Sequence, residues 1–463
     1  MSHSVTGVVA EGAHEQAAHN ARAGGTGALP AGSALLFAAQ VATNLGYFVA
    51  VLLLARGLDP SARGTVAFLT ITALVVSRLA RLGVADATTV LAARRSRQRS
   101  ALLSNLLGFT ISAMLGAAGL LSLVILLGRI HPAGIKDRQL ILLAVGILAS
   151  GLVDAGSSFM LGLGRIAELA ALNAVGPWIY AAFVATASVF FGLTPTRAVI
   201  AWAAGHSIWA AMVVVASKRG TPLVRMDRSL LQESIAFGVR AWIGGLSRFL
   251  NFRVDQILMG FISAQAALGI YAVAVNASEV LLILPGAAAT ALLPALARSA
   301  PRERLERTLR IVRSVTLLTA ATVIAAAIVG PPLVTSIFGG RYQDATTPFV
   351  LLIPGAIGFA LMVIFSNALV AASAPGRSSL GPLAALVSGF VLDLILIPPF
   401  GASGAAAAAT VAFACGGVVS AAAFRSAAPF QLRALAPARA DVRALLALTA
   451  RRPLRPRSGS GTP

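Results

Sequence analysis

Residues 139–163 read QLILLAVGILASGLVDAGSSFMLGL, a stretch in which Asp154 is the only charged side chain. A helix of this length spans about 37 Å, which exceeds the roughly 30 Å hydrocarbon core of a bilayer. Lipid offers no hydrogen-bond partner to a backbone amide, so such a run is stable in a membrane only when its amides are paired within the segment. The stretch therefore predicts a membrane-spanning α-helix.

Similar apolar runs recur along most of the chain and predict about twelve spanning helices. Six are expected in the first half, near 33–55, 64–84, 101–127, 139–163, 168–191 and 198–217. Six more are expected in the second half, near 235–262, 267–294, 311–338, 346–372, 379–399 and 403–424. Of the 463 residues, 57% are apolar and 11% are charged, whereas soluble domains carry about 25% charged residues. The predicted fold is an all-α polytopic membrane protein, since the strands of a β-barrel would alternate apolar and polar residues.

The distribution of basic residues predicts the orientation. With the N-terminus in the cytoplasm, the cytoplasmic loops and tails carry 25 Lys and Arg residues and the external loops carry 7. The positive-inside rule then places both termini in the cytoplasm of a multi-pass protein of the bacterial inner membrane. A pI near 11.8 is also typical of nucleic-acid-binding proteins. Here the basic residues stand between apolar runs rather than on a soluble module, so no nucleic acid partner is expected.

The predicted spans divide the chain into five segments. Residues 1–32 are polar, lack the order of a signal peptide, and are expected to be a disordered cytoplasmic tail. Two six-helix lobes, 33–217 and 235–424, flank a polar cytoplasmic linker, 218–234. The basic cytoplasmic tail 425–463 is either solvated or contains a short amphipathic helix that lies on anionic headgroups.

The two halves resemble each other. The stretch GTVAFLTITALVVSRLARLGVADATTVLAARR, starting at Gly64, parallels GIYAVAVNASEVLLILPGAAATALLPALARS, starting at Gly269. Further on, LGLGR ending at Arg165 parallels SAPGR ending at Arg377. Because each half has six predicted helices, the two copies keep the same orientation in the membrane. The pattern therefore indicates a parallel repeat about an axis near the membrane normal.

Two stretches carry a resemblance to a known family: NLGYFVAVLLLARGLDPSARGTVAF, 44–68, and FRVDQILMGFISAQAALGIYAVAVNASEVLLILPGAAATALLPALA, 252–297. They resemble Wzx-type polysaccharide flippases of the multidrug/oligosaccharidyl-lipid/polysaccharide exporter superfamily. The resemblance implies two lobes around a central cavity and alternating access for a lipid-linked oligosaccharide, such as one on undecaprenyl diphosphate, in polysaccharide or lipopolysaccharide biosynthesis. Implied partners are this substrate, membrane lipids, H⁺ or Na⁺, and polysaccharide polymerase or export proteins.

Charged side chains within spans are costly in lipid and usually face a cavity or a partner. On a continuous helix over 235–262, a polar set falls within about 80°. The set is Arg240, Gly244, Arg248, Asn251 and Asp255. It predicts a polar stripe that lines the cavity, with the two arginines binding the diphosphate or acidic sugars, because a guanidinium stays charged and offers paired donors.

Other readings of these cations stay open. Arg240 could snorkel to the cytoplasmic interface, while Arg253 and Asp255 could form a structural ion pair near the outer end. Arg78 and Arg81 share a face of the second predicted helix. They either line the cavity or snorkel to the interface.

Carboxylates within spans are candidates for coupling transport to H⁺ or Na⁺. They are Glu279, Asp255, Asp154 and Asp393, each with a structural ion pair to an arginine as the rival reading. The lone cysteine, Cys415, excludes an internal disulfide and a cysteine-based metal site, and no metal or cofactor is expected.

The sequence contains no P-loop, GxSxG or HExxH motif, so we expect a transporter driven by an ion or substrate gradient rather than an enzyme. Four alternatives remain. A multidrug/cation antiporter of the same superfamily would favour an acidic and aromatic cavity. A lipid II flippase commonly has fourteen spans. A glycan polymerase or ligase would need a large external loop, and a membrane scaffold would need none of these features.

Overall fold

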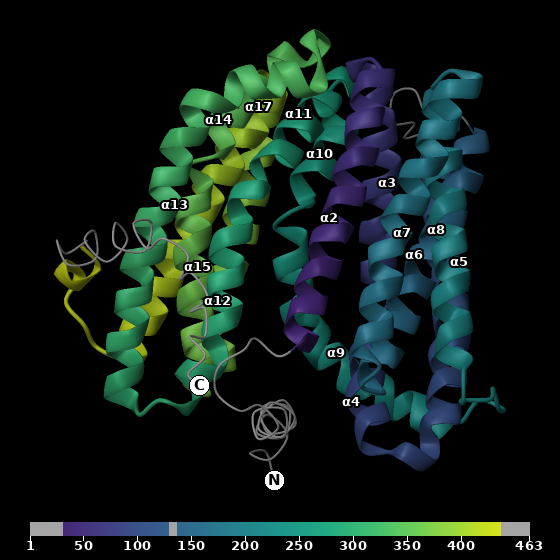
Figure 1. The fold of residues 1–463 in the computed structure, drawn as a ribbon, viewed down its shortest axis with the longest axis horizontal. Helices are drawn as coiled ribbons and strands as arrows, with labels where there is room; N and C mark the ends of the chain where they lie inside the picture. Colours follow the sequence, from purple (N-terminus) through teal and green to yellow (C-terminus); the bar gives the residue numbers. More distant parts are fainter. Residues whose placement is uncertain (1–30, 129–136, 437–463) are drawn as a thin grey trace, which may run out of the picture.

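The computed structural model describes residues 31–128 and 137–436, and that part of the chain contains helices and no strands. The predicted disordered N-terminal tail lies almost wholly outside the described residues, as does most of the basic C-terminal tail. The helices gather into two bundles that stand side by side (Figure 1).

The first-half bundle is drawn in purple and blue in Figure 1. Its helices are α2 Ala31–Gly57, α3 Pro60–Ala80, α4 Val84–Arg94, α5 Arg99–Gly128, α6 Asp137–Gly162, α7 Ile166–Thr186 and α8 Pro195–Lys218. Helix α2 packs on α7, α6 packs on α8, and α5 packs on α6. Apolar side chains such as Leu69, Ile147 and Val184 fill the space between them and are fully buried.

The second-half bundle is drawn in green and yellow, and α9 and α10 lead into it from the first bundle (Figure 1). Its helices are α9 Arg228–Leu250, α10 Val254–Ile262, α11 Gln265–Ser278, α12 Val280–Arg298, α13 Pro301–Phe338, α14 Thr346–Leu352, α15 Gly355–Ala371, α16 Pro375–Ser378 and α17 Leu380–Ala427. Helix α15 packs on α17 and α12. Four further short segments are 3₁₀ or π helices: η1 Ser96–Gln98, η2 Ala187–Phe191, η3 Gly340–Ala345 and η4 Leu432–Leu435.

The expectation of twelve unbroken spans is not confirmed. Among the described residues, nine helices are long and apolar enough to cross a membrane, or ten when α14 and α15 count as one bent span. The stretch 376–427 counts once although it covers two predicted spans, and Gly401 interrupts its helical geometry with φ 53° and ψ −126°. The predicted spans 235–262, 267–294 and 346–372 are each divided between two helices, whereas α3 covers most of 64–84.

Local sequence signals explain where several helices begin. The carboxylate of Asp59 accepts a hydrogen bond from the Ala62 amide at 3.0 Å, and Pro60 stands at the first position of α3. Asp227 caps α9 in the same way, and its hydrogen bonds from Ser229 and Leu230 lower the pKa of this exposed carboxyl. Such side chains pair amides that the first turn of a helix leaves without partners.

The two halves touch at equivalent positions of the sequence repeat. Helix α3 packs on α11, and the crossing brings Gly64 against Gly269. A Cβ atom added at Gly64 would lie 1.8 Å from the Gln265 carbonyl oxygen, and one added at Gly269 would lie 1.8 Å from that of Pro60. Residues related by a two-fold axis meet each other on that axis. The contact therefore agrees with a parallel repeat.

A second contact joins the halves where α9 packs on α4. Gly83 has φ 71°, and a Cβ atom there would lie 2.1 Å from the Gly238 carbonyl oxygen. Arg95 donates two hydrogen bonds to Glu233, of 2.8 and 2.6 Å, which raise the pKa of this guanidinium. The linker was predicted over 218–234, but α9 begins within it at Arg228, and the first turns of this helix lie against the first-half bundle.

Candidate functional site

A cluster of three charged side chains lies in the first-half bundle next to α9; we call it the Asp154 triad. Arg78 belongs to the last turn of α3, Arg81 directly follows that helix, and Asp154 belongs to α6. Oδ2 of Asp154 lies 3.6 Å from Nε of Arg78 and 3.4 Å from Nη1 of Arg81. The side chain of Arg81 is 9% exposed, that of Asp154 24% and that of Arg78 36%. Two cations therefore share one carboxylate oxygen and leave a net positive charge.

Aromatic side chains from other helices surround the triad. The guanidinium of Arg78 lies over the ring of Phe249 on α9, 5.2 Å from its centroid. Trp242, also on α9, donates a hydrogen bond of 2.9 Å to the Arg78 carbonyl oxygen. Tyr47 of α2 interacts electrostatically with Asp154. The triad thus stands where α2, α3, α6 and α9 come together.

A second polar cluster lies inside the second-half bundle. Arg253, in the break between α9 and α10, donates a hydrogen bond of 2.6 Å to Glu279. Asp255, at the start of α10, is buried and accepts hydrogen bonds from the Tyr271 hydroxyl and from the Gln256 amide. The cluster combines residues of α10 and α11 with Arg253 and Glu279 from the breaks on either side, so no single helical period relates them.

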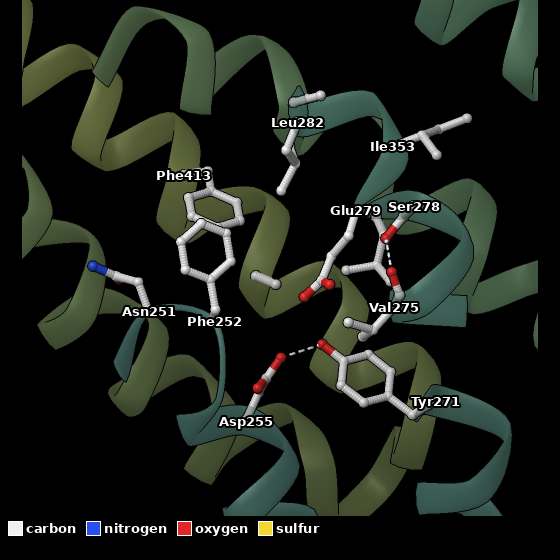
Figure 2. Close-up of a pocket in the computed structure, with 13 residues that line it drawn as sticks. Asn251, Phe252, Asp255, Tyr271, Val275, Ser278, Glu279, Leu282, Ile353 and Phe413 are labelled. Atoms are coloured by element: carbon white, nitrogen blue, oxygen red, sulfur yellow. Dashed lines mark hydrogen bonds between the residues drawn. The ribbon is translucent and has the colours of Figure 1, made fainter. Parts of the chain in front are cut away.

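This cluster lines a pocket with an empty volume of about 440 Å³. Figure 2 shows the carboxylates of Asp255 and Glu279 directed toward the same space, with the rings of Phe252 and Phe413 beside them. A smaller pocket of about 270 Å³ shares Asp255 and Phe413 and is also lined by Asp393 of α17. Asp393 is buried, and its Oδ1 has no hydrogen-bond partner in the described part of the chain.

The carboxylates of Asp255 and Asp393 in an otherwise largely apolar lining suit a small hard cation, because such ions prefer carboxylate, carbonyl and hydroxyl oxygens. Nowhere within 31–128 and 137–436 do three His, Cys, Asp or Glu side chains form a group that could hold a metal ion. A cation in these pockets would therefore depend on the two carboxylates of Asp255 and Asp393 together with neutral oxygens.

Comparison with protein families shows which family the chain belongs to. Residues 53–347 match the family described as polysaccharide biosynthesis protein, and this range covers more than half of the sequence. The chain belongs to the polysaccharide biosynthesis protein family. The resemblance to polysaccharide flippases that the sequence predicted is confirmed at the level of the family.

Two relatives of this polysaccharide biosynthesis protein come from Haloferax volcanii. The probable low-salt glycan biosynthesis flippase Agl15 is 24% identical over 287 residues, which cover 60% of this chain and 59% of the relative. The probable flippase AglR is 26% identical over 195 residues, which cover 39% of each protein. The chain therefore spans less than two thirds of the length of either relative.

Solved structures of other proteins have a similar fold. The lipid II flippase MurJ in an inward closed conformation matches with a TM-score of 0.71 and 14% identity, over 90% of this chain and 93% of that one. An inward-facing multidrug resistance MATE family transporter of the MOP superfamily matches with a TM-score of 0.65 and 13% identity, over 83% of this chain and 94% of that one. At these identities the likeness concerns the fold.

Within this polysaccharide biosynthesis protein, the predicted substrate residues do not form one group. Arg78 and Arg81 lie together in the Asp154 triad. Arg248 is exposed in the last turn of α9, and Asn251 donates hydrogen bonds to the carbonyl oxygens of Ser247 and Pro382. The backbone of Arg240 lies in α9, but its side chain is outside the described residues.

The predicted polar stripe along 235–262 is wrong beyond Asn251, because the helix does not continue. Helix α9 ends at Leu250 and α10 begins at Val254, so the rotation of 100° per residue does not carry through to Asp255. The alternative pairing of Arg253 with Asp255 is also not what forms. Arg253 pairs with Glu279, and Asp255 is bonded to Tyr271.

The four carboxylates predicted to couple transport to ions fall into two groups. Glu279 and Asp154 are engaged with arginines, the rival reading that the sequence left open for each carboxylate. Asp255 and Asp393 instead line one pocket without an arginine within ion-pair distance in the described part of the chain.

Sequence reasoning missed the partners of these groups. Tyr271 lies in an apolar run and Phe249 follows Arg248, so the sequence did not indicate that they would contact Asp255 and Arg78. The hydrogen bond from Trp242 to the Arg78 carbonyl oxygen was also not predicted. The available signal for Tyr271 was its place in the stretch that carried the family resemblance.

Proposed function

We propose that this chain is a flippase that moves a lipid-linked oligosaccharide, carried on undecaprenyl diphosphate, across the bacterial inner membrane for polysaccharide biosynthesis. The observation that carries the proposal is the arginine pair of the Asp154 triad at the junction with α9, in a chain whose residues 53–347 match the polysaccharide biosynthesis protein family. The Haloferax relatives, which are described as probable flippases, support the same function.

The chemistry of the triad suits a diphosphate. A guanidinium keeps its charge at physiological pH and offers several N–H donors in a plane, which match the oxygens of a phosphate group. Arg78 and Arg81 together carry two positive charges against the single charge of Asp154. An anionic headgroup is therefore attracted, while an organic cation is repelled.

The energy source that fits is an ion gradient acting at Asp255 and Asp393. Both carboxylates are buried and line one pocket. Two nearby carboxylates in a poorly solvated site repel each other, and a shared proton or a bound Na⁺ relieves that repulsion. Binding of H⁺ or Na⁺ at this pocket, which joins α10 to α17, would stabilise one arrangement of the second-half bundle and so bias alternating access.

The membrane arrangement belongs to the same proposal. The excess of basic residues in alternate loops supports both termini in the cytoplasm and the lobes 33–217 and 235–424 as the two moving bodies. The substrate would pass between them, and polysaccharide polymerase or export proteins would receive it on the far side.

The test uses a strain whose chromosomal copy is deleted. We expect undecaprenyl-linked oligosaccharide to accumulate on the cytoplasmic leaflet, and the wild-type chain to clear it. The variant with Arg78→Gln and Arg81→Gln should restore less than about a tenth of the flux, because each substitution removes a charged hydrogen-bond donor. Normal surface glycan in the deletion strain, without accumulation of the lipid-linked precursor, would contradict the proposal.

A second candidate, a multidrug/cation antiporter, is favoured by one observation: Asp255 and Glu279 share the larger pocket with aromatic rings. Acidic and aromatic groups bind organic cations. Against it, Glu279 is already paired with Arg253. Efflux of a fluorescent cation from proteoliposomes, with no movement of a lipid-linked oligosaccharide, would select this candidate. A lipid II flippase is selected instead if lipid II is the precursor that accumulates.

A further inference from the structure

The Asp154 triad is more loosely paired than the Arg253–Glu279 pair of the second-half bundle. Arg253 approaches Glu279 to 2.6 Å. In the triad, the two nitrogen–oxygen distances are 3.6 and 3.4 Å, beyond the usual length of a charged hydrogen bond. Nε of Arg78 and Nε of Arg81 are both buried and have no hydrogen-bond partner among the described residues. The chain therefore forms tight pairs elsewhere but leaves donors unused here.

The number of charges and donors does not match one carboxylate. Two guanidiniums together present ten N–H donors and two positive charges, whereas Asp154 supplies two oxygens and one negative charge. Unused donors in a poorly solvated site are costly. A diphosphate group, with more oxygen acceptors and more negative charge, would satisfy Arg78 and Arg81 better than Asp154 does.

The position of the triad allows such an exchange. Arg78 is 36% exposed and Asp154 24% exposed, so both side chains are accessible to an incoming anion. Phe249 and Trp242 of α9 touch Arg78 through its guanidinium and its carbonyl oxygen. A change in what Arg78 binds would therefore alter its contacts with α9, the helix that leads into the second-half bundle.

We propose that Asp154 is an internal substitute for the substrate's diphosphate. In the empty carrier Asp154 holds Arg78 and Arg81 in place and partly neutralises them. The arriving diphosphate displaces the carboxylate, and the carboxylate returns as the substrate leaves, which speeds release. This inference rests on the proposed function, since it assumes an anionic headgroup, and it makes Asp154 a positioning residue rather than an ion-coupling one.

The first experiment measures binding of farnesyl diphosphate, a short polyprenyl diphosphate, to the full-length protein in detergent. Asp154→Asn removes the competing charge with little change in size. We expect it to lower the Kd about tenfold, because a charged competitor for the two guanidiniums is gone. Asp154→Glu, which keeps the charge, should bind nearly as the wild type does. Glu168→Gln is the matched control, because it breaks a carboxylate–arginine contact in the same bundle, with Arg165 and Arg219, away from the triad.

The second experiment measures transport by the same variants in proteoliposomes. For Asp154→Asn we expect both KM and the maximal rate to fall, because the substrate binds more tightly and leaves more slowly. A purely structural role would lower the melting temperature and the rate without lowering Kd or KM.

The outcomes separate this inference from the proposed function. If the wild type binds farnesyl diphosphate and Asp154→Asn binds it equally or more weakly, the inference is overturned while the flippase proposal stands. If neither protein binds it, both are overturned. Tighter binding by Asp154→Asn alone, with unchanged binding by Glu168→Gln, supports both.

Discussion

Asp255 and Asp393 show how single residues acquire a role through their neighbours. Asp255 has two hydrogen-bond donors, from the Tyr271 hydroxyl and the Gln256 amide, whereas one oxygen of Asp393 has none among the described residues. A buried carboxylate oxygen without a donor is costly unless a proton or a cation occupies it. The pair therefore has the properties of a site that fills and empties during a cycle.

At this scale we expect Asp393→Asn to uncouple transport from the ion gradient. The amide keeps the size of the side chain but removes the charge that would attract H⁺ or Na⁺. Transport into proteoliposomes should lose its stimulation by an imposed gradient, with a drop of about tenfold in the stimulated rate, equivalent to roughly 1.4 kcal/mol. Asp86→Asn, at an exposed position in the first turn of α4, is the control and should keep the stimulation. A variant Asp393→Asn that responds normally to both gradients would remove this pocket from the mechanism.

Helix breaks determine which side chains meet at the next scale. Between α9 and α10 the backbone leaves its helical hydrogen bonding, and side chains take over the freed carbonyl oxygens. Asn251 donates to those of Ser247 and Pro382, and Arg253 donates to that of Phe252. Broken helices are tolerated within membranes when neighbouring groups satisfy the freed backbone in this way. The break also turns Arg253 toward Glu279.

At the close crossing of α3 and α11, we expect one added methyl group to lower the stability of the protein. Gly64→Ala places a Cβ atom against the backbone of Gln265, which cannot move aside as a flexible side chain could. We expect a loss of about 1–3 kcal/mol, the usual effect of overpacking, measured as a lower melting temperature in detergent. The matched control is Gly116→Ala in α5, where an added Cβ meets nothing within 4 Å. Equal melting temperatures for the two variants would show that the α3–α11 contact is not close in solution.

At the scale of the whole molecule, the halves are joined by several contacts, and two of these lie on different parts of α3 and α4. One is the glycine crossing of α3 and α11, and the other is the contact of α4 with α9, which includes the Arg95–Glu233 ion pair. Alternating access requires contacts between two lobes to open in turn. These two contacts are therefore among the positions where opening would be seen.

The predicted orientation can be tested on intact cells. We start from Cys415→Ala, which removes the only cysteine, and introduce Arg97→Cys or Arg341→Cys at exposed loop positions. A membrane-impermeant maleimide should label Arg341→Cys from outside, and should label Arg97→Cys only after the membrane is permeabilised. This follows because the positive-inside rule places the two loops on opposite sides. Labelling of both from outside would refute the orientation.

The sequence predicted the helical membrane fold and the family, but not the composition of the polar sites. Arg78 and Arg81 could be recognised as unusual because they lie in an otherwise apolar stretch of the sequence. Their partner Asp154 is more than seventy positions away, on another helix. The helical period relates residues within one helix only, and it failed for Asp255 once α9 ended at Leu250.

By itself, the stretch 139–163 with its many counterparts determined that this chain forms membrane helices, because the length of an apolar run and the pairing of its own amides are local properties. Those runs did not determine which charges meet. Tertiary packing decided that Asp154 faces two arginines, that Arg253 pairs with Glu279, and that Gly64 lies on Gly269. The reason is that such contacts depend on how whole helices break, rotate and cross, and no single segment contains that information.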